Sequence, residues 1–134
     1  MTVKEPGSRW SITIVILLAV FVLDLQAKVA SAAERIVSAR PGELIRMLAE
    51  SAPGDTLVLE PGRHDGPVVL DRPITIDGRG HAELVGNGTG SVITISGHDV
   101  VVRSLRIVGS GNEHGPINSG VLITRKASQV LVDN

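Results

Sequence analysis

Cysteine and tyrosine are absent from the 134 residues, and the only aromatic side chains besides histidine, Trp10 and Phe21, lie near the amino terminus. Without cysteine the chain has no disulfide bond, no thiolate metal site and no cysteine nucleophile. It also has no cysteine that could carry a lipid at a cleavage site. Beyond Phe21 no Phe, Tyr or Trp ring can stack on a sugar face. The fold of this region must therefore depend on backbone hydrogen bonds and aliphatic packing.

The chain also lacks an excess of basic residues. It has 13 Lys and Arg against 14 Asp and Glu, for a formal net charge of −1. Domains that bind nucleic acid carry a basic face that neutralises phosphates, and this composition offers none. The length allows one domain at most. We therefore expect a small aliphatic domain that binds no nucleic acid.

The longest apolar run, Ile12–Leu23, ends at Asp24 and is shorter than the roughly 20 residues that span a bilayer. Basic residues precede this run, and the small residues Ala30-Ser31-Ala32 follow it, as in a secretory signal peptide. We expect residues 1–32 to be a signal peptide that is cleaved after Ala32, leaving no membrane span in the exported chain. An uncleaved membrane anchor is the alternative.

One segment after Ala32 has helical periodicity. Its apolar residues recur at helical spacing after Pro41 and stop before Ala52-Pro53-Gly54, which predicts an amphipathic helix of about three turns over Pro41–Ser51. A short predicted strand, Arg35–Ser38, precedes it. We therefore divide the exported chain into a strand and helix over residues 33–53 and a second region over residues 54–134.

From Gly54 onward the chain consists of short β-branched and aliphatic runs, each closed by Gly, Asp or Asn. Such runs predict strands of three or four residues. The predicted strands are Thr56–Leu59, Pro67–Leu70, Ile74–Ile76, Glu83–Val85, Val92–Ile95, Val100–Val102, Leu105–Val108, Val121–Thr124 and Val130–Val132.

Several of these runs resemble one another, which indicates a repeated unit of variable length. The similar pairs are Ile74–Gly78 with Ile93–Gly97, Ser91–Ile93 with Gly120–Leu122, and Asp99–Val102 with Gln129–Val132. Such repeats predict an all-β solenoid, a parallel β-helix in which each coil buries its inward aliphatic side chains against its neighbours. An antiparallel sandwich with hairpin turns is the alternative. We expect positive φ at the turn glycines Gly62, Gly78, Gly97 and Gly109.

In a β-helix the amphipathic helix at Pro41–Ser51 has a role at one end of the stack. A helix laid across the open hydrophobic end covers the core and blocks edge pairing. The sequence has no comparable segment near Asn134, which follows a predicted strand directly. We therefore expect a solenoid that is truncated at its carboxyl-terminal end and represents the first coils of a longer protein.

Several segments of the chain resemble the opening coils of the periplasmic NosD-like proteins. These segments are Gly54–Leu57, Pro61–Gly66, Asp71–Gly80, Ser91–Ile95, Val100–Gly111 and Gly120–Asn134. That family consists of right-handed parallel β-helices of the carbohydrate-binding and sugar-hydrolase repeat type, similar in fold to pectate lyases. Its members assist the maturation of copper-containing nitrous oxide reductase. The family usually has Tyr in a Pro-Gly-x-Tyr-x-Gly turn, where this chain has His64.

The resemblance implies a periplasmic accessory protein that is not an enzyme. It would bind a partner protein, either the copper enzyme or its transport machinery, or a metal carrier. Copper is the metal that the resemblance implies, and imidazole suits copper. Among the histidines, His114 in the long loop Gly109–Gly120 is the first metal candidate, with Glu113 beside it and His98 as a further candidate. The alternative is that each histidine is a solvated loop residue.

A carbohydrate-binding or carbohydrate-active β-helix is a second hypothesis. Lyases and epimerases of this fold need clustered Asp with a basic residue, to neutralise the uronate and abstract a proton. The near matches are Asp71-Arg72, Asp77 with Arg79, and Arg103 with Arg106. None forms a known catalytic motif, and the lack of Phe, Tyr and Trp argues against a sugar-binding face. An inactive fragment of a longer β-helix protein is a third hypothesis.

Overall fold

The computed structural model describes residues 31–112 and 117–134. Nearly all of the predicted signal peptide and residues 113–116 of the long loop lie outside these ranges. The signal peptide and its cleavage after Ala32 therefore stay predictions. Within the described ranges, no helix is long and apolar enough to cross a membrane.

The described residues form one helix and nine strands. In chain order these are β1 (Glu34–Val37), α2 (Glu43–Glu50), β2 (Thr56–Leu59), β3 (Gly62–Asp65), β4 (Val68–Leu70), β5 (Ile74–Val85), β6 (Ile93–Ile95), β7 (His98–Val108), β8 (Val121–Ile123) and β9 (Ser128–Asp133). The β5 and β7 strands each combine two predicted strands, because the backbone continues its pairing around a bend.

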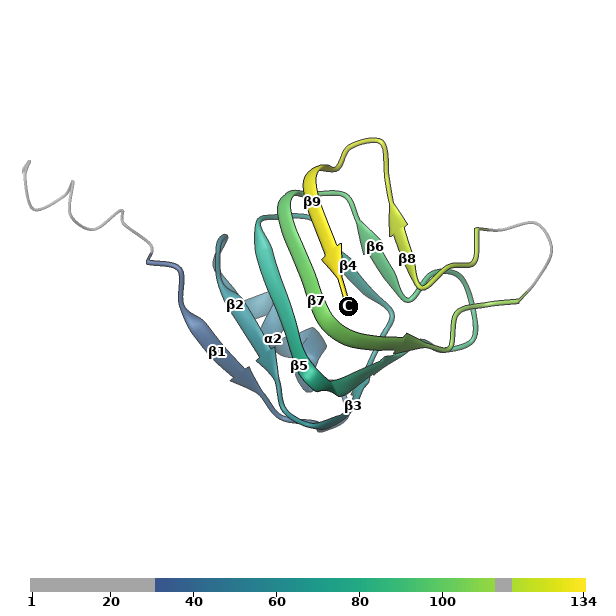
Figure 1. Cartoon of the computed structure of the whole chain (residues 1–134), viewed down its shortest axis with the longest axis horizontal. Helices are drawn as coiled ribbons and strands as arrows, with labels where there is room; N and C mark the ends of the chain where they lie inside the picture. Colours follow the sequence, from purple (N-terminus) through teal and green to yellow (C-terminus); the bar gives the residue numbers. More distant parts are fainter. Residues whose placement is uncertain (1–30, 113–116) are drawn as a thin grey trace, which may run out of the picture. The chain divides into compact units, whose positions relative to one another are not determined.

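The strands lie in two sheets, and all pairs between the described strands are parallel. The first sheet has the order β1-β2-β5-β7-β9, with β3 pairing beside the second half of β5, and the second sheet has the order β4-β6-β8 (Figure 1). The chain passes from one sheet to the other in each coil and makes about four turns. The predicted β-helix is therefore confirmed, and the antiparallel sandwich is wrong.

The register between coils shows which sequence similarities are structural. Val100 pairs with Val130, as the similarity of their segments predicts. In contrast, Ile74 pairs with Val100 in the first sheet, whereas Ile93 pairs with Val68 in the second. The similar segments that begin at Ile74 and Ile93 are therefore not equivalent, because alternating Ile and Thr suit either side of the stack.

The core consists of rows of aliphatic side chains, one from each coil. Leu57, Ile76 and Val102 form one such row, because they are Cα partners in successive strands, and all three are buried. Successive side chains of a strand point to opposite faces, so the residues between them point outward. In β6, where Ile93 and Ile95 are buried on either side of Thr94, the alternation in the sequence agrees with the side that faces the core.

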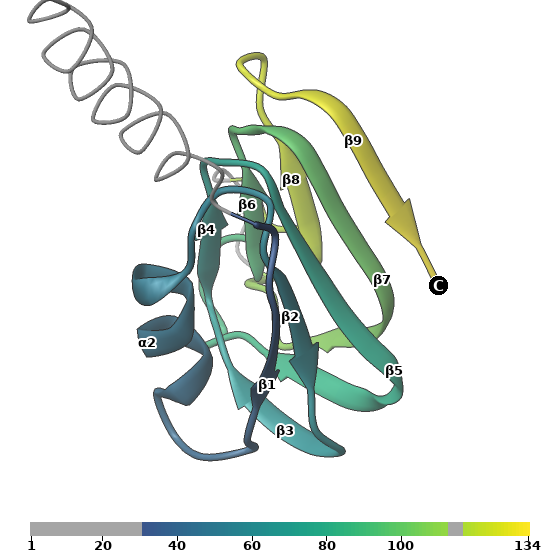
Figure 2. The same ribbon diagram turned by 90° about the vertical axis from the view of Figure 1, so that its left-hand side faces the viewer.

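The α2 helix lies at the amino-terminal end of the stack, where it contacts β3 and β1 and lies beside β4 (Figure 2). Its Leu44, Met47 and Leu48 side chains join the core, as predicted for an amphipathic helix that covers this end. It has eight residues and is shorter than the predicted three turns, because Gly42 adopts a left-handed conformation at the N-cap position. In chain order α2 stands between two strands of the first sheet, where the next coil has β3 and β4.

The β3 strand was not predicted, since its sequence Gly-Arg-His-Asp has no β-branched residue. It forms by parallel pairing with residues 82–85 of β5 in the next coil. The ladder of the neighbouring coil therefore overrides a poor local propensity for β structure.

Two of the four turn glycines have a role other than the predicted one. Gly62 and Gly109 adopt positive φ, as expected, but Gly78 and Gly97 do not. A Cβ atom on Gly97 would collide with the backbone of Asp71 and Arg72, and one on Gly78 with the carbonyl oxygen of Ser104. These two positions need glycine because adjacent coils approach closely there.

Candidate functional site

The predicted metal ligands are distributed between described and undescribed parts of the chain. Glu113 and His114 lie outside the described residues. His98 begins β7 and is exposed, and its Nδ1 lies 2.8 Å from Oδ2 of Asp99. A carboxylate at Nδ1 orients the ring and leaves Nε2 for a metal, a common arrangement for histidine ligands. Over residues 31–112 and 117–134, no three His, Asp or Glu side chains cluster as metal ligands would.

His64 is not the solvated loop residue that the sequence predicts. It lies on β3 in register with Leu84, and its side chain is buried. Its Nε2 lies 2.8 Å from the carbonyl oxygen of Glu60, whereas its Nδ1 is buried without a hydrogen-bond partner. The inward position follows from the unpredicted strand, whose alternation points His64 at the core.

The Asp77 side chain lies near the bend of β5 and is only 7% exposed. The coil register places it beside Arg103 of β7. Its Oδ2 accepts a hydrogen bond from Nε of Arg103 at 2.9 Å, and Nη2 of Arg103 lies 2.9 Å from the same atom. Its Oδ1 accepts a hydrogen bond from the backbone N–H of Arg79 at 2.9 Å. Both oxygens of the carboxylate are therefore occupied.

The charge state of Asp77 follows from these contacts. Burial by itself would raise the pKa of Asp77, but the hydrogen bonds from Arg79 and Arg103, with their positive charges, outweigh it and lower the pKa. A carboxylate with a lowered pKa and both oxygens bonded is a poor general base. Asp77 therefore links two coils, and its geometry does not match the proton abstraction required of a lyase.

Arg103 and Arg106, which the sequence suggested as a pair, contact different carboxylates. Nη1 of Arg106 lies 3.4 Å from Oε2 of Glu83, and Nε of Arg63 lies 3.6 Å from Oε1 of the same residue. These three residues are Cα partners in β3, β5 and β7, so they form a row of alternating charge in which both arginines are exposed and Glu83 is half-buried. Sequence reasoning missed this row because the coil lengths differ and hide the equivalence.

A second buried carboxylate, Asp55, was also missed. Its Oδ1 accepts a hydrogen bond from the N–H of Ala33 at 3.0 Å, and its Oδ2 accepts one from the N–H of Ala52 at 2.9 Å. These two hydrogen bonds lower the pKa of Asp55, although burial opposes them. Asp55 thus joins the start of β1 to the segment after α2. Its place directly before the predicted strand at Thr56 was the only signal in the sequence.

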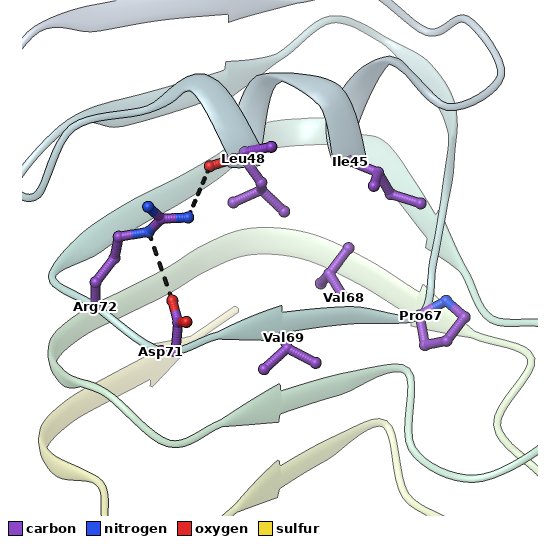
Figure 3. Close-up of a pocket in the computed structure, with 8 residues that line it drawn as sticks. Ile45, Leu48, Pro67, Val68, Val69, Asp71 and Arg72 are labelled. Atoms are coloured by element: carbon purple, nitrogen blue, oxygen red, sulfur yellow. Dashed lines mark hydrogen bonds and ion pairs between the residues drawn. The ribbon is translucent and has the colours of Figure 1, made fainter.

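An open groove of about 310 Å³ lies between α2 and β4. Figure 3 shows Ile45 and Leu48 of α2 facing Val68 across it, with Val69 on the β4 side. At one end, Nη2 of Arg72 donates a hydrogen bond to the carbonyl oxygen of Leu48 at 3.0 Å, and Nε of Arg72 lies 3.5 Å from Asp71. The lining residues are Ile45, Leu48, Ala49, Pro67, Val68, Val69, Asp71 and Arg72.

The lining of this groove is chiefly aliphatic, and its volume is at the lower end of the range for ligand sites. The Asp71-Arg72 pair, considered above for a lyase, lies at its end with the guanidinium directed at the α2 carboxyl terminus. The groove has an apolar wall and no free acid–base pair among its lining residues. It is therefore better suited to binding than to proton-transfer chemistry.

Comparison with known proteins gives one informative similarity. The chain is 26% identical over 117 residues to a Pseudomonas aeruginosa protein described as "Probable ABC transporter binding protein NosD". The aligned region covers 75% of this chain and 27% of that protein, so the chain spans about a quarter of its relative. No protein-family model matches the chain, and no solved structure matches it. The chain is thus similar to one segment of a NosD protein, and it folds as a β-helix.

Proposed function

We propose that this chain is, or belongs to, an exported accessory protein of the NosD-like kind that acts by binding a partner protein and not by catalysis. The observation that carries the proposal is the similarity to NosD across most of a chain that folds as a β-helix. The predicted signal peptide at residues 1–32 supports export to the periplasm. The partner would be a component of an ABC transport system or the copper enzyme that it serves.

The state of the acidic residues supports binding over catalysis. Asp77 lies within ion-pair distance of Arg79 and Arg103, and both of its oxygens are hydrogen-bonded. A polysaccharide lyase of this fold would need a free base close to a bound uronate. The exposed apolar groove beside α2, in contrast, offers a surface for a partner.

The experiment that tests this proposal deletes the gene in its host and follows periplasmic nitrous oxide reductase. We expect the enzyme to accumulate without its full copper content, and the full chain supplied on a plasmid to restore it. A chain whose residues 12–23 carry two added aspartates should fail to restore copper, because export would be blocked. A fully copper-loaded enzyme in the deletion strain would overturn the proposal.

A lyase assay separates the carbohydrate alternative. The exported protein is incubated with polygalacturonate and with alginate, and unsaturated uronate products are measured. Under the proposal neither polymer is cleaved. Cleavage that disappears in Asp77→Asn, while the variant still melts cooperatively, would establish the enzymatic alternative.

Direct copper binding is a further candidate activity, favoured by the geometry of His98. Asp99 holds Nδ1 of His98, so that Nε2 is the nitrogen left for a metal. His98, Glu113 and His114 are the residues that would supply ligands, and copper would give the protein a role as carrier. Titration of the exported protein with copper tests it, with His114→Ala and His98→Ala expected to weaken binding and His81→Ala, an exposed control, expected to leave it unchanged. Equal binding by all four proteins would exclude these ligands.

A further inference from the structure

The groove beside α2 contains an unpaired strand edge. The second sheet has the order β4-β6-β8, so β4 has a neighbouring strand on one side only among the strands of residues 31–112 and 117–134. The N–H of Val68 donates to the carbonyl oxygen of Val92, and the N–H of Ser96 donates to the carbonyl oxygen of Leu70. Because backbone groups alternate in direction along a parallel strand, the N–H and C=O of Val69 point away from β6.

The side of β4 to which the backbone of Val69 points is the side on which α2 lies. Arg72, two residues after β4, donates a side-chain hydrogen bond to the carbonyl oxygen of Leu48 in α2. No backbone hydrogen bond joins this helix and this strand within residues 31–112. The groove of about 310 Å³ therefore contains a backbone donor and acceptor beside an aliphatic wall.

The apolar residues along the groove divide into a floor and two walls. Val68 and Leu48 are buried beneath it. Ile45 is 48% exposed on the α2 side and Val69 is 62% exposed on the β4 side, so both have aliphatic surface left to cover. An extended peptide matches both the unpaired backbone of Val69 and the exposed aliphatic surface, since its backbone can pair with a sheet edge while alternate side chains fill an apolar pocket.

We propose that the groove binds a short extended segment of the partner protein, whose backbone pairs with Val69 and whose aliphatic side chain lies between Ile45 and Val69. This inference rests on the proposed function, because it supplies the mode by which a partner binds. The three-residue length of β4 limits the pairing to the two backbone groups of one residue. The segment is therefore short, and much of the affinity comes from its aliphatic side chain.

The test uses the protein purified after export of the full chain, with a soluble peptide of alternating threonine and valine as the probe. Amide exchange of Val69 is measured by NMR without and with peptide. We expect saturating peptide to slow this exchange by about tenfold and to shift the Ile45 methyl signals, because a new backbone bond covers the amide. The same peptide N-methylated at its valines keeps the side chains but lacks those donors, and it should bind at least about tenfold more weakly.

Matched variants locate the binding surface. Ile45→Ser should weaken peptide binding by about tenfold, because an aliphatic contact is lost. Ile36→Ser removes an isoleucine of similar exposure from β1 and should leave binding unchanged. Val69→Pro removes an N–H that takes no part in the β4-β6 ladder, so the fold should tolerate it, and peptide binding should weaken because one of the two backbone bonds is lost. Val69→Thr keeps this N–H and should still bind the peptide.

Three results would overturn the inference. These are equal binding of the N-methylated peptide, equal loss of binding in Ile45→Ser and Ile36→Ser, and groove shifts that follow protein concentration without peptide, which would identify a second copy of the chain as the occupant. Failure here is distinct from failure of the proposed function. Normal copper loading in the deletion strain, with Val69 still protected by peptide, would exclude the accessory role but not the groove. Incomplete copper loading without protection of Val69 would exclude only the proposed mode of binding.

Discussion

Ile95 and Ile123 occupy equivalent positions in β6 and β8, yet their side chains are 0% and 52% exposed. The same contrast holds for Val102 and Val132, Cα partners in β7 and β9, at 1% and 45%. All four strands have an aliphatic residue at the compared position. Among the described strands, β6 and β7 have a neighbouring strand on both sides, whereas β8 and β9 have one on one side. In this fold the burial of a coil's side chains depends on the neighbouring coils and not on the coil's own sequence.

At the amino-terminal end, a helix in place of another coil buries the side chains of the first coils. The α2 helix places Leu44, Met47 and Leu48 against the first coils, and the inward residues of β4 are buried. An amphipathic helix thus replaces a strand-bearing coil as the neighbour. Two backbone carbonyls near its carboxyl terminus, those of Leu48 and Glu50, accept hydrogen bonds from Arg72 and Arg35. The cover is therefore attached to both sheets.

The largest expected effect comes from removing the same side chain from an inner and an outer coil. Ile95→Ala should lower the free energy of unfolding by about 2–5 kcal/mol, because it leaves a cavity in a close-packed core. Ile123→Ala should lower it by less than about 1 kcal/mol, since solvent already contacts that side chain. Urea denaturation of the two variants measures the difference. Equal losses would contradict the dependence of burial on neighbouring coils.

The helical cover can be tested in the same way. Leu44→Ala removes a buried side chain of α2 and should cost about 2–4 kcal/mol, as in a core strand. Ile45→Ala, one residue along the helix, should cost less than about 1 kcal/mol because that side chain is half exposed. The midpoint of urea unfolding reports both. A small loss for Leu44→Ala would show that the helix contributes little to the core.

The links between coils provide a smaller contrast. Arg103→Met deprives the buried Asp77 of its charged donor and should cost about 1–3 kcal/mol. Arg106→Met makes the same substitution at an exposed arginine and breaks only its contact with Glu83. It should lower the free energy of unfolding by about 0–1 kcal/mol. Thermal unfolding at neutral pH compares the two. If both variants lose the same stability, the burial of Asp77 does not strengthen its contacts.

The smallest expected effect is on the way stability changes at acidic pH. The pKa of Asp55 is lowered in the folded chain. Between the folded and the unfolded pKa the unfolded chain therefore binds more protons, and the free energy of unfolding increases with pH. This contribution is present above the ordinary aspartate value of 3.8 and is lost as the pH falls through the folded pKa. We expect Asp55→Asn to reduce stability by about 1 kcal/mol at neutral pH and to flatten its acid dependence. Unfolding followed by circular dichroism from neutral to acid pH measures both, with Asp133→Asn, at an exposed aspartate near the end of β9, as a control.

Much of the architecture followed from local pattern. The run TLVL at Thr56–Leu59 predicts β2 with the observed bounds, and the predicted strand Val92–Ile95 exceeds β6 by one residue, because β-branched patterning is a local property. The amphipathic helix and its covering role were also predicted. The strand β3 was not, since its pairing with β5 lies in the next coil and its own residues give no signal.

The candidate sites were less predictable. Asp77 and Arg103 are far apart in sequence and meet only through the register of two coils. The similarity between the segments at Ile74 and Ile93 suggests a different register, so sequence comparison alone would place Asp77 beside the wrong residues. The groove depends on α2 lying beside β4, which the helix sequence does not specify.

The sequence by itself determined that this protein is an aliphatic, disulfide-free solenoid with one amphipathic helix, because side-chain periodicity and the absence of cysteine are properties of the chain alone. The tertiary structure decided which residues meet across coils: the contact of Asp77 with Arg103, the burial of His64, and the groove with its unpaired edge at Val69. The physical reason is that the coils differ in length. Equivalent positions are therefore set by packing of the whole stack, and no fixed spacing in the sequence reveals them.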